Sequence, residues 1–477
     1  MRKLLPAGLA LALALPLSAA ADEAADIQAL RKEIETMRAE YEARLRALED
    51  RLRAAEGAAA AGAPATAAPP AAGTPAPVTA APAPVPPVTP PPAPPVAAAP
   101  AAGPNAFNPS VSLILSGVYT RTSQDPANYA ITGVSLPSNV AIGPGTRGFS
   151  LAESELGLAA NVDPWFRGAA NIAIEPDDTV STEEAFVQTT SLGSGFSVRA
   201  GRFFSSAGYL NSQHSHTWDF VDNPLAYQAF LGTQYGDDGV QVSWVAPTEQ
   251  YIELDAEVGR GRPFPGSDTG RNGPGAVALI AHTGGDVGDS NSWRTGLSML
   301  DARVTDQQLM GTRSSGSAVT NAFTGGTHVW VADAVWKWAP HGNAVYTNFK
   351  LQSEYLRNIR SGTLDFDING IDRAGAYRAV QSGWYLQGVY QPIRYWRVGL
   401  RTEQVDPGSP EYGLNAAALR SFDYRPHKSS LMIDYSPSEF SRVRLQFARD
   451  RAHEGSPDNE LVMQYLMSLG AHGAHSF

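Results

Sequence analysis

The chain has no cysteine among its 477 residues. Disulfide scaffolds and thiolate metal sites are therefore excluded. Beyond its first segment the sequence also lacks any run of about 18 or more strongly apolar residues, which argues against a membrane-spanning helix. If the chain enters a membrane, it must do so as a β-barrel, because only helices and closed barrels satisfy their backbone hydrogen bonds in lipid.

Two functional classes find little support in the sequence. The formal net charge is −11, so we expect no nucleic-acid partner. The G-x-S-x-G, H-E-x-x-H and Gly-Lys phosphate-loop motifs are all missing, so no nucleophile beside a base is indicated. We therefore predict that the chain is not an enzyme and carries no cofactor.

Residues 1–104 divide into three segments, which precede the predicted strands. Residues 1–21 are typical of a secretory signal peptide, with Arg2 and Lys3 before a short apolar stretch and small residues at the cleavage position. Residues 22–56 carry apolar side chains at three- and four-residue spacing between Glu, Lys and Arg, which predicts a coiled coil of undetermined strand number. The alternative there is an isolated amphipathic helix. Residues 57–104 are almost all Ala, Pro, Gly, Val and Thr, which predicts an extended linker.

Residues 105–477 alternate in hydropathy with a period of two, as strands with one apolar face do. The pattern is clearest from Leu461 to Leu469 and continues to Phe477, an ending that resembles the assembly signal of bacterial outer-membrane barrels. We predict an all-β transmembrane barrel of about sixteen antiparallel strands, with both ends on the periplasmic side. The strands are expected to begin near Ser110, Phe149, Phe166, Thr179, Phe196, Gly239, Gln250, Ala276, Asn291, Thr327, Val345, Tyr377, Arg394, Lys428, Phe440 and Glu460.

Short turns and long loops alternate between these strands, which is the layout of outer-membrane barrels. The long loops are expected at 121–148, 205–238, 260–274, 301–326, 359–376 and 405–427. Side chains do not fill a barrel of this size, so a water-filled channel is expected. We predict that the loop 205–238 folds into the lumen as a constriction, with an external flap as the alternative. The constriction residues would be His214, His216, Asp219 and Asp222.

The charges that should face the lumen differ in sign between early and late strands. The predicted acidic wall consists of Glu153, Glu155, Glu253, Asp255 and Glu257. The predicted basic wall consists of Lys350, Arg397, Arg401, Arg442 and Arg444. Inward positions are favoured because a charge on the lipid face near the midplane costs about 2–4 kcal/mol. The two walls would face each other across the pore; the alternative is that the charges pair locally and only stiffen the barrel.

A weak metal-binding pattern lies in the loop 205–238. His214 and His216, with Asp219 and Asp222 nearby, are residue types that suit zinc. Two histidines on a loop are more often solvated or hydrogen-bonded, so we predict no metal site and keep these histidines as weak candidates. His472 and His475, close to the C-terminus, are weaker candidates still.

Four segments resemble bacterial outer-membrane porins, and the closest resemblance is to the phosphate-selective porin O and P-like group. The segments are Ser150–Leu156, Asn161–Phe166, Glu184–Gln188 and Ala200–Phe204. The coiled coil, the Pro/Ala linker and the ending 470–477 are also similar to proteins labelled zinc-regulated TonB-dependent outer membrane receptors. The resemblance implies an outer-membrane barrel with a transport function.

The sequence departs from both groups. Phosphate selectivity in the porin group is associated with lumenal Lys and Arg, whereas residues 105–477 contain only Lys337, Lys350 and Lys428 as lysines. We therefore do not predict phosphate as the solute. TonB-dependent receptors have about 22 strands and an internal plug, and no segment of this chain has the length or composition for them, so the receptor mechanism is not predicted.

The expected function is that of an outer-membrane porin through which small hydrophilic solutes or ions diffuse. The expected partners are outer-membrane lipids, the barrel assembly machinery and two further copies of the chain in a homotrimer, with the N-terminal region in the periplasm. Two alternatives stay open. One is an outer-membrane anchor that tethers the envelope through its coiled coil, and the other is an uptake channel specific for a metal such as zinc.

Overall fold

The structure is a computed structural model, which describes residues 109–267, 270 and 272–470. The predicted signal peptide, coiled coil and linker lie outside the described residues. So does the segment 471–477, which includes the predicted assembly signal and two of the weak histidine candidates. Within the described ranges, no helix is long and apolar enough to cross a membrane.

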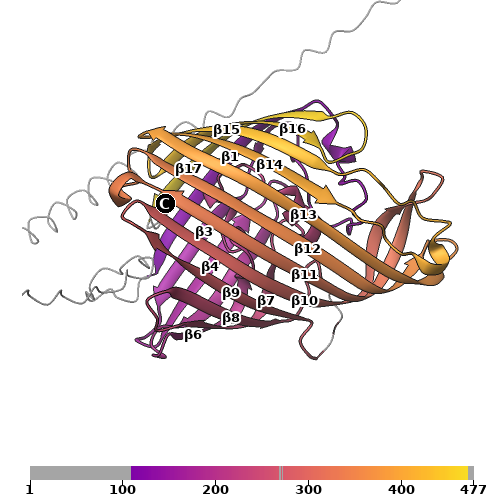
Figure 1. The fold of residues 1–477 in the computed structure, drawn as a ribbon, viewed down its shortest axis with the longest axis horizontal. Coiled ribbons are helices and arrows are strands. Elements are labelled where there is room, and N and C mark those ends of the chain that lie inside the picture. Colours follow the sequence, from indigo (N-terminus) through magenta and orange to yellow (C-terminus); the bar gives the residue numbers. More distant parts are fainter. Residues whose placement is uncertain (1–108, 268–269, 271, 471–477) are drawn as a thin grey trace, which may run out of the picture. The chain divides into compact units, whose positions relative to one another are not determined.

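Antiparallel strands form one closed barrel (Figure 1). Closure comes from β1 (Ser110–Thr122), which pairs on one side with β17 (Asp458–Gly470) and on the other with β2 (Gly148–Leu151) and β3 (Ser154–Asn161). Because β2 and β3 pair with the same strand and are separated by a short break at Glu153, they are two parts of one barrel strand. The 17 strands therefore make a ring of 16, which confirms the predicted all-β barrel.

The remaining strands follow one another around the ring in chain order. They are β4 (Phe166–Ile174), β5 (Val180–Thr189), β6 (Phe196–Phe204), β7 (Gly236–Val245), β8 (Tyr251–Gly259), β9 (Ala276–Val287), β10 (Asn291–Thr312), β11 (Ala318–Trp338), β12 (Asn348–Phe366), β13 (Arg373–Ile393), β14 (Trp396–Asp406), β15 (His427–Ser438) and β16 (Ser441–Arg451). The described loops contain the α-helix α2 (Leu225–Leu231) and the 3₁₀ helices η1 (Pro126–Asn128), η2 (Ser215–Thr217), η3 (Pro340–Gly342) and η4 (Gly413–Asn415).

The period of two in the sequence separates the two faces of each strand. In β17, Glu460, Val462 and Gln464 are buried inside the barrel, whereas Leu461 and Met463 are exposed on its outer surface. A slip of one residue in the pairing would exchange these faces, so the hydropathy pattern fixes the register. An outward band of apolar side chains is the surface that a barrel in lipid requires.

The predicted loops at 301–326 and 359–376 are wrong. The strands β10 and β11 continue through most of the first range, and β12 and β13 continue through most of the second. In these extensions the inward face is apolar and buried, as at Val304, Phe323 and Leu364. Some of the polar residues that indicated loops, such as Arg303 and Thr324, lie on the outward face, because a strand that extends past the apolar band needs no apolar outer surface.

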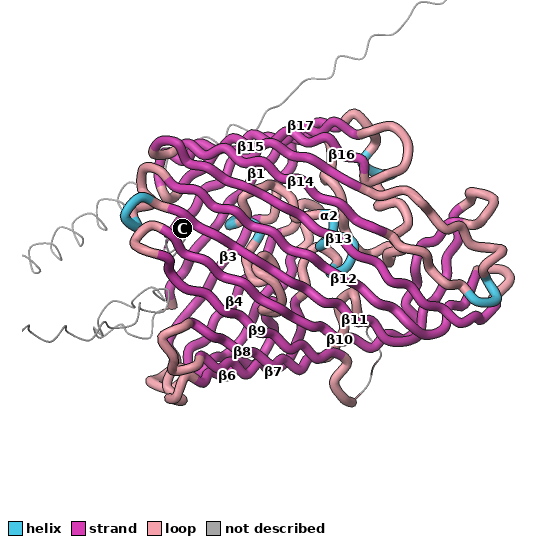
Figure 2. Tube along the Cα trace, viewed as in Figure 1, coloured by secondary structure: helices cyan, strands magenta, loops and turns pink. Residues whose placement is uncertain are grey.

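The segment between β6 and β7 lies inside the ring of strands, and Figure 2 shows its helix α2 within that ring. We call residues 205–235 the inner loop. All seven residues of α2 are buried, and the helix packs against β12, β13 and β14. The loop therefore turns inward; whether it restricts the passage of solutes stays a prediction.

A second loop, residues 123–147, crosses the barrel end that carries the long loops. The hydroxyl of Tyr129 donates to Asp450 Oδ2 on β16 at 3.1 Å. The amide of Gly143 donates to Gln228 Oε1 of α2, also at 3.1 Å. The loop 123–147 is thus attached both to the barrel wall and to the inner loop.

Candidate functional site

The first turn of the inner loop is held by carboxylates that accept its backbone N–H groups. Glu257 on β8 accepts from the amide of Ser206 at 2.9 Å. Glu354 on β12 accepts from the amides of Tyr209 and Leu210 at 3.2 and 3.0 Å. Hydrogen bonds to an ionised acceptor are stronger than neutral ones. Glu257, predicted as part of an acidic wall facing open water, instead lies against the inner loop.

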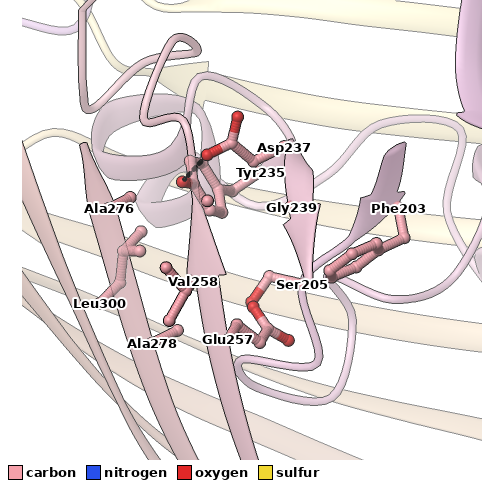
Figure 3. Close-up of a pocket in the computed structure, with 11 residues that line it drawn as sticks. Phe203, Ser205, Tyr235, Asp237, Gly239, Glu257, Val258, Ala276, Ala278 and Leu300 are labelled. Carbon is pink, nitrogen blue, oxygen red and sulfur yellow. Dashed lines mark hydrogen bonds between the residues drawn. The ribbon is translucent and has the colours of Figure 1, made fainter. Parts of the chain in front are cut away.

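Figure 3 shows this corner of the barrel, where the inner loop ends and β7 begins. The hydroxyl of Tyr235 donates to Asp237 Oδ2 at 3.2 Å, and burial, followed by the charge of Asp237, raises the pKa of Tyr235 well above its ordinary value. Together with Glu257 these residues line a cavity of about 10 Å³. That volume holds at most about one water molecule, so the corner is packed and is not a path for solutes.

The middle of the inner loop is attached to the late strands through Asp219. Its carboxylate lies 2.5 Å from Lys350 Nζ on β12 and 3.1 Å from Arg397 Nη1 on β14, and it accepts from Gln387 Nε2 on β13 at 3.1 Å. Burial alone would raise the pKa of Asp219, but Lys350 and Arg397 lower it to about 2. Asp219 is therefore ionised at neutral pH.

Asp222 makes the next attachment. Its carboxylate lies 2.8 Å from Arg401 Nη2 and 2.9 Å from Lys428 Nζ, and it accepts from Gln446 Nε2 at 2.8 Å. Burial opposes ionisation, yet Arg401 and Lys428 hold the pKa of Asp222 well below its ordinary value. Between them, the two aspartates tie the inner loop to five strands, from β12 to β16.

Two arginines of β16 also hold the inner loop, through its carbonyl groups. Arg442 donates to the carbonyl oxygen of His216 at 2.7 Å. Arg444 donates to the carbonyl oxygen of Trp218 at 2.8 Å and forms an ion pair with Asp434 at 2.7 Å. Each residue of the predicted basic wall thus faces inward and contacts the inner loop or a carboxylate.

Asp219 and Asp222, predicted as constriction residues, are in direct contact with residues of the predicted basic wall. The cause is electrostatic, since a buried cation without a partner is strongly destabilising. Glu403 and Asp434 on the strands form ion pairs with part of these cations. The inner loop adds the carboxylates of Asp219 and Asp222.

The histidines of the inner loop contact the early strands instead. His214 Nδ1 lies 3.3 Å from Glu155 Oε2 and 3.3 Å from Glu183 Oε2, and His216 Nδ1 lies 3.1 Å from Glu155 Oε2. Burial lowers the pKa of His214, but hydrogen bonds and charges from the neighbouring glutamates raise it well above its ordinary value. Asp219 and Asp222, which were predicted to lie near these histidines, contact the cations of the late strands instead.

The remaining residues of the predicted acidic wall also face inward. Glu153, in the break between β2 and β3, accepts a hydrogen bond from the hydroxyl of Ser215 in the inner loop. Asp255 is buried on β8, and Glu253 Oε2 lies 3.5 Å from His282 Nδ1 on β9. The inner loop therefore spans the lumen, from the glutamates of the early strands to the cations of the late strands.

Two larger cavities lie at the two ends of the barrel. The turn-end cavity, about 1130 Å³, is lined by the histidines of the inner loop and by the short turns 344–345, 394–395 and 436–440. The cavity at the other end, about 860 Å³, is lined by the loop 123–147 and by the extensions of the long strands. Solutes entering from either side would meet the inner loop between the two cavities.

Comparison with known proteins places the chain in a family. The family model described as phosphate-selective porin O and P matches residues 165–421. An uncharacterized protein of Aquifex aeolicus (strain VF5) is 32% identical over 351 residues, which cover 69% of this chain and 70% of that protein. The chain belongs to the phosphate-selective porin O and P family. It is an outer-membrane porin, a channel that small hydrophilic solutes cross by passive diffusion.

Two solved structures match this one over most of its length at low sequence identity. The anion-selective porin from Comamonas acidovorans is 12% identical, with a TM-score of 0.46 over 76% of this chain and 99% of that chain. The outer membrane channel DcaP of Acinetobacter baumannii is 11% identical, with a TM-score of 0.45 over 77% of this chain and 99% of that chain.

Several residues that hold the inner loop of this porin were missed in the sequence. They include Glu183, Glu184, Glu354, Lys428 and Asp434. For Asp434 and Lys428 the signal was present, since both share the inward parity of β15. For Glu183 and Glu184 the sequence held no such signal, because adjacent residues in a regular strand face opposite sides. Here a β-bulge on β5 turns both glutamates inward.

Proposed function

We propose that this porin passes small anions in preference to cations, and that the turn-end cavity sets the preference. The observation that carries the proposal is the charge of the cavity lining. Its Lys and Arg side chains are Arg294, Lys337, Lys350, Arg394, Arg397 and Arg442, whereas its acidic side chains are Asp219 and Glu439. A cavity lined by an excess of one sign concentrates ions of the opposite sign.

Two arginines carry about half of this excess. Within the described residues, neither Arg294 nor Arg442 forms an ion pair with a carboxylate. Arg294 contacts His282 Nε2 at 2.8 Å and lies 5.3 Å from the ring of Tyr209, and Arg442 donates to a backbone carbonyl. Lys350 and Arg397 share Asp219, so they too retain part of their positive charge toward the cavity.

The acidic residues of the lumen do not cancel this field, because most are turned away from the cavity. Glu257 and Glu354 accept hydrogen bonds from the inner loop, which lies over them. Neither belongs to the cavity lining. Guanidinium groups bind carboxylate and phosphate oxygens in pairs of hydrogen bonds, so arginines can serve where the lysine count is low.

Proteoliposome swelling tests the proposal. Vesicles containing the refolded full-length porin would be diluted into solutions of an organic anion, a neutral sugar and an organic cation of similar size. We expect the order of swelling rates to be anion, sugar, cation. The double variant Arg294→Gln with Arg442→Gln should reduce the anion rate severalfold, whereas Arg425→Gln, which removes an exposed charge outside the cavity, should not. Equal anion and cation rates in the wild-type protein would contradict the proposal.

The assembly and the orientation are part of the same proposal. We propose that the N-terminal region lies in the periplasm, since an even number of barrel strands brings both chain ends to the end with short turns.

We also propose a homotrimer. The support is the outward face of the short strands β3 to β6, which carries several small side chains: Ala160, Gly168, Ala170, Ala185 and Ala200. Cross-linking in native membranes should give a three-chain species; a monomer alone would contradict this part.

A further inference from the structure

Imidazole and carboxylate groups meet where the inner loop touches the early strands. The group consists of His214 and His216 of the inner loop, Glu155 of β3 and Glu183 of β5, and we call it the histidine cluster. Ligand atoms of Glu155, Glu183 and His214 all lie within 4.8 Å of one another. His216 joins them through its Nδ1, 3.1 Å from the same Glu155 oxygen.

Three distances within the histidine cluster are close to the edges of a tetrahedral metal site. Zinc binds histidine nitrogen and carboxylate oxygen at about 2.0–2.2 Å, so neighbouring ligands of a tetrahedral ion lie about 3.3–3.5 Å apart. The three contacts in the cluster measure 3.1, 3.3 and 3.3 Å. Glu155, Glu183 and His214 are close enough to share an ion as they stand, whereas His216 does not lie within 4.8 Å of all three and would have to move to complete the site.

An independent observation concerns Glu155 Oε2. The side chain is 6% exposed, and no well-aligned hydrogen bond reaches this oxygen although two imidazole nitrogens lie 3.3 and 3.1 Å away. A buried carboxylate oxygen without a donor is costly, and a bound cation removes that cost. Among the described residues, no Lys or Arg forms an ion pair with Glu155 or Glu183, so no fixed cation competes for the position.

The residue behind His214 also favours the tautomer that a metal ligand needs, with the ring proton on Nε2. His214 Nε2 lies 3.0 Å from Glu184 Oε2, and Asn171 Nδ2 donates to the same Glu184 oxygen at 3.3 Å. When Nε2–H donates to Glu184, the Nδ1 lone pair points at Glu155 and Glu183. A carboxylate behind a ligating histidine is the usual support of a zinc ligand. The bulge on β5 makes this possible, because it turns Glu183 and Glu184 to the same side.

We propose that the histidine cluster binds a divalent transition-metal ion such as Zn²⁺, which clamps the inner loop to β3 and β5. The ion is a fixed part of the channel and not its solute. It would complete the attachment of the inner loop, whose other side is tied to the late strands by Asp219 and Asp222. The histidines line the turn-end cavity, so the ion has a route from solution. The inference is independent of the proposed anion preference.

A second group with the same residue types serves as an internal control. Glu253, Asp255 and His282 also have ligand atoms within 4.8 Å of one another. However, the Arg294 guanidinium lies 2.8 Å from His282 Nε2. If Arg294 donates there, His282 Nδ1 carries the proton, and a fixed positive charge stands beside the position of the ion. We therefore expect no metal binding at this second group.

Metal titration of the refolded full-length porin, without an added histidine tag and after chelator treatment, tests the proposal. Zn²⁺ affinity would be measured by competition with a chromophoric chelator, and Co²⁺ would report the geometry, since a tetrahedral Co²⁺ site absorbs visible light far more strongly than the hydrated ion. We expect one tight site per chain and a tetrahedral Co²⁺ spectrum. Absence of tight binding, or a spectrum like that of hydrated Co²⁺, would overturn the proposal.

Variants locate the site. Glu155→Gln keeps the side-chain shape and should weaken Zn²⁺ binding at least 100-fold. Glu184→Gln should weaken it about 10- to 100-fold, the range for residues that support a ligand. His282→Gln should leave it unchanged. His472 and His475 are retained throughout, so binding at the C-terminus would appear equally in all variants and would overturn the assignment. Each variant would first be shown to migrate as a folded barrel, and Glu184→Gln tests the site if Glu155→Gln fails to fold.

Discussion

The carboxylate of Asp219 lies 2.5 Å from the ammonium of Lys350, and this ion pair joins the inner loop to the barrel wall. Arg397 approaches the other oxygen of the same carboxylate at 3.1 Å. A single loop residue thus forms ion pairs with two cations that belong to different strands. The position of the inner loop is therefore set by the charge of the late strands.

Replacing Asp219 by Asn should loosen the inner loop. Lys350 and Arg397 would lose their shared partner, and we expect a loss of about 3 kcal/mol in docking free energy, the lower end for breaking a buried ion pair. Limited proteolysis of the refolded barrel should cut the inner loop faster than in the wild type. Asp289→Asn, an exposed carboxylate in a turn, is the control. Identical cleavage of Asp219→Asn and wild type would show that the ion pair does not hold the loop.

Acid should release the same contact. Burial alone would raise the pKa of Asp219, but Lys350 and Arg397 lower it from 3.8 to about 2. Because the pKa is depressed in the docked state, the stabilisation is fully present above about pH 4 and is lost as the pH falls toward 2. Channel current recorded from pH 7 to pH 2 should change in that window. The double variant Asp219→Asn with Asp222→Asn should show no such transition; a wild-type transition near pH 6 would point to other groups.

Lys428 should be the cation whose loss destabilises the barrel most. Its ammonium lies 2.7 Å from Glu460, 2.9 Å from Asp222 and 3.3 Å from Asp450, and the side chain is 1% exposed. Lys428→Met leaves Glu460 and Asp450 without a cation and Asp222 with Arg401 alone, which should cost about 3–5 kcal/mol. Urea unfolding in detergent micelles measures the change.

The control for Lys428 is Arg425→Gln, which removes an exposed charge three residues earlier in the sequence. We expect its midpoint in urea to stay within about 0.5 kcal/mol of the wild type. If Lys428→Met unfolds at the same urea concentration as this control, the buried charge cluster does not contribute to stability.

Tyr227→Phe should loosen the inner loop less than Asp219→Asn does. The Tyr227 hydroxyl donates to Glu354 at 2.8 Å, and the ring packs in the buried core around α2. Removing the hydroxyl alone should cost about 1–2 kcal/mol, since Glu354 keeps its other donors. The proteolysis assay used for Asp219 measures it, and an effect larger than that of Asp219→Asn would contradict the ranking.

Most of the barrel could be predicted from the sequence because strand faces follow a local rule. Alternation assigned Glu257 and Arg397 to the inside, and the alternation of short turns with long loops gave the number of strands. The extensions of β10 to β13 were missed for a physical reason. Beyond the apolar band the outer face is polar, so the pattern there no longer resembles that of a strand in lipid.

The pairing of charges inside the lumen could not be predicted. Asp219 and Lys350 are far apart in the sequence, and only the closed ring decides which strands the inner loop reaches. The same limit applies to His214, whose partners Glu155 and Glu183 come from strands on the other side of the loop. The bulge that turns Glu183 and Glu184 together has no signature in the hydropathy pattern.

The reversal potential of single channels tests the central claim most directly. The refolded full-length porin would be inserted into a planar bilayer with KCl at different concentrations on the two sides. Stable open steps with a reversal potential near the chloride equilibrium value are predicted, because solutes pass the inner loop through the cation-lined cavity. A reversal potential near the potassium value, or no conductance from a correctly folded barrel, would contradict the account.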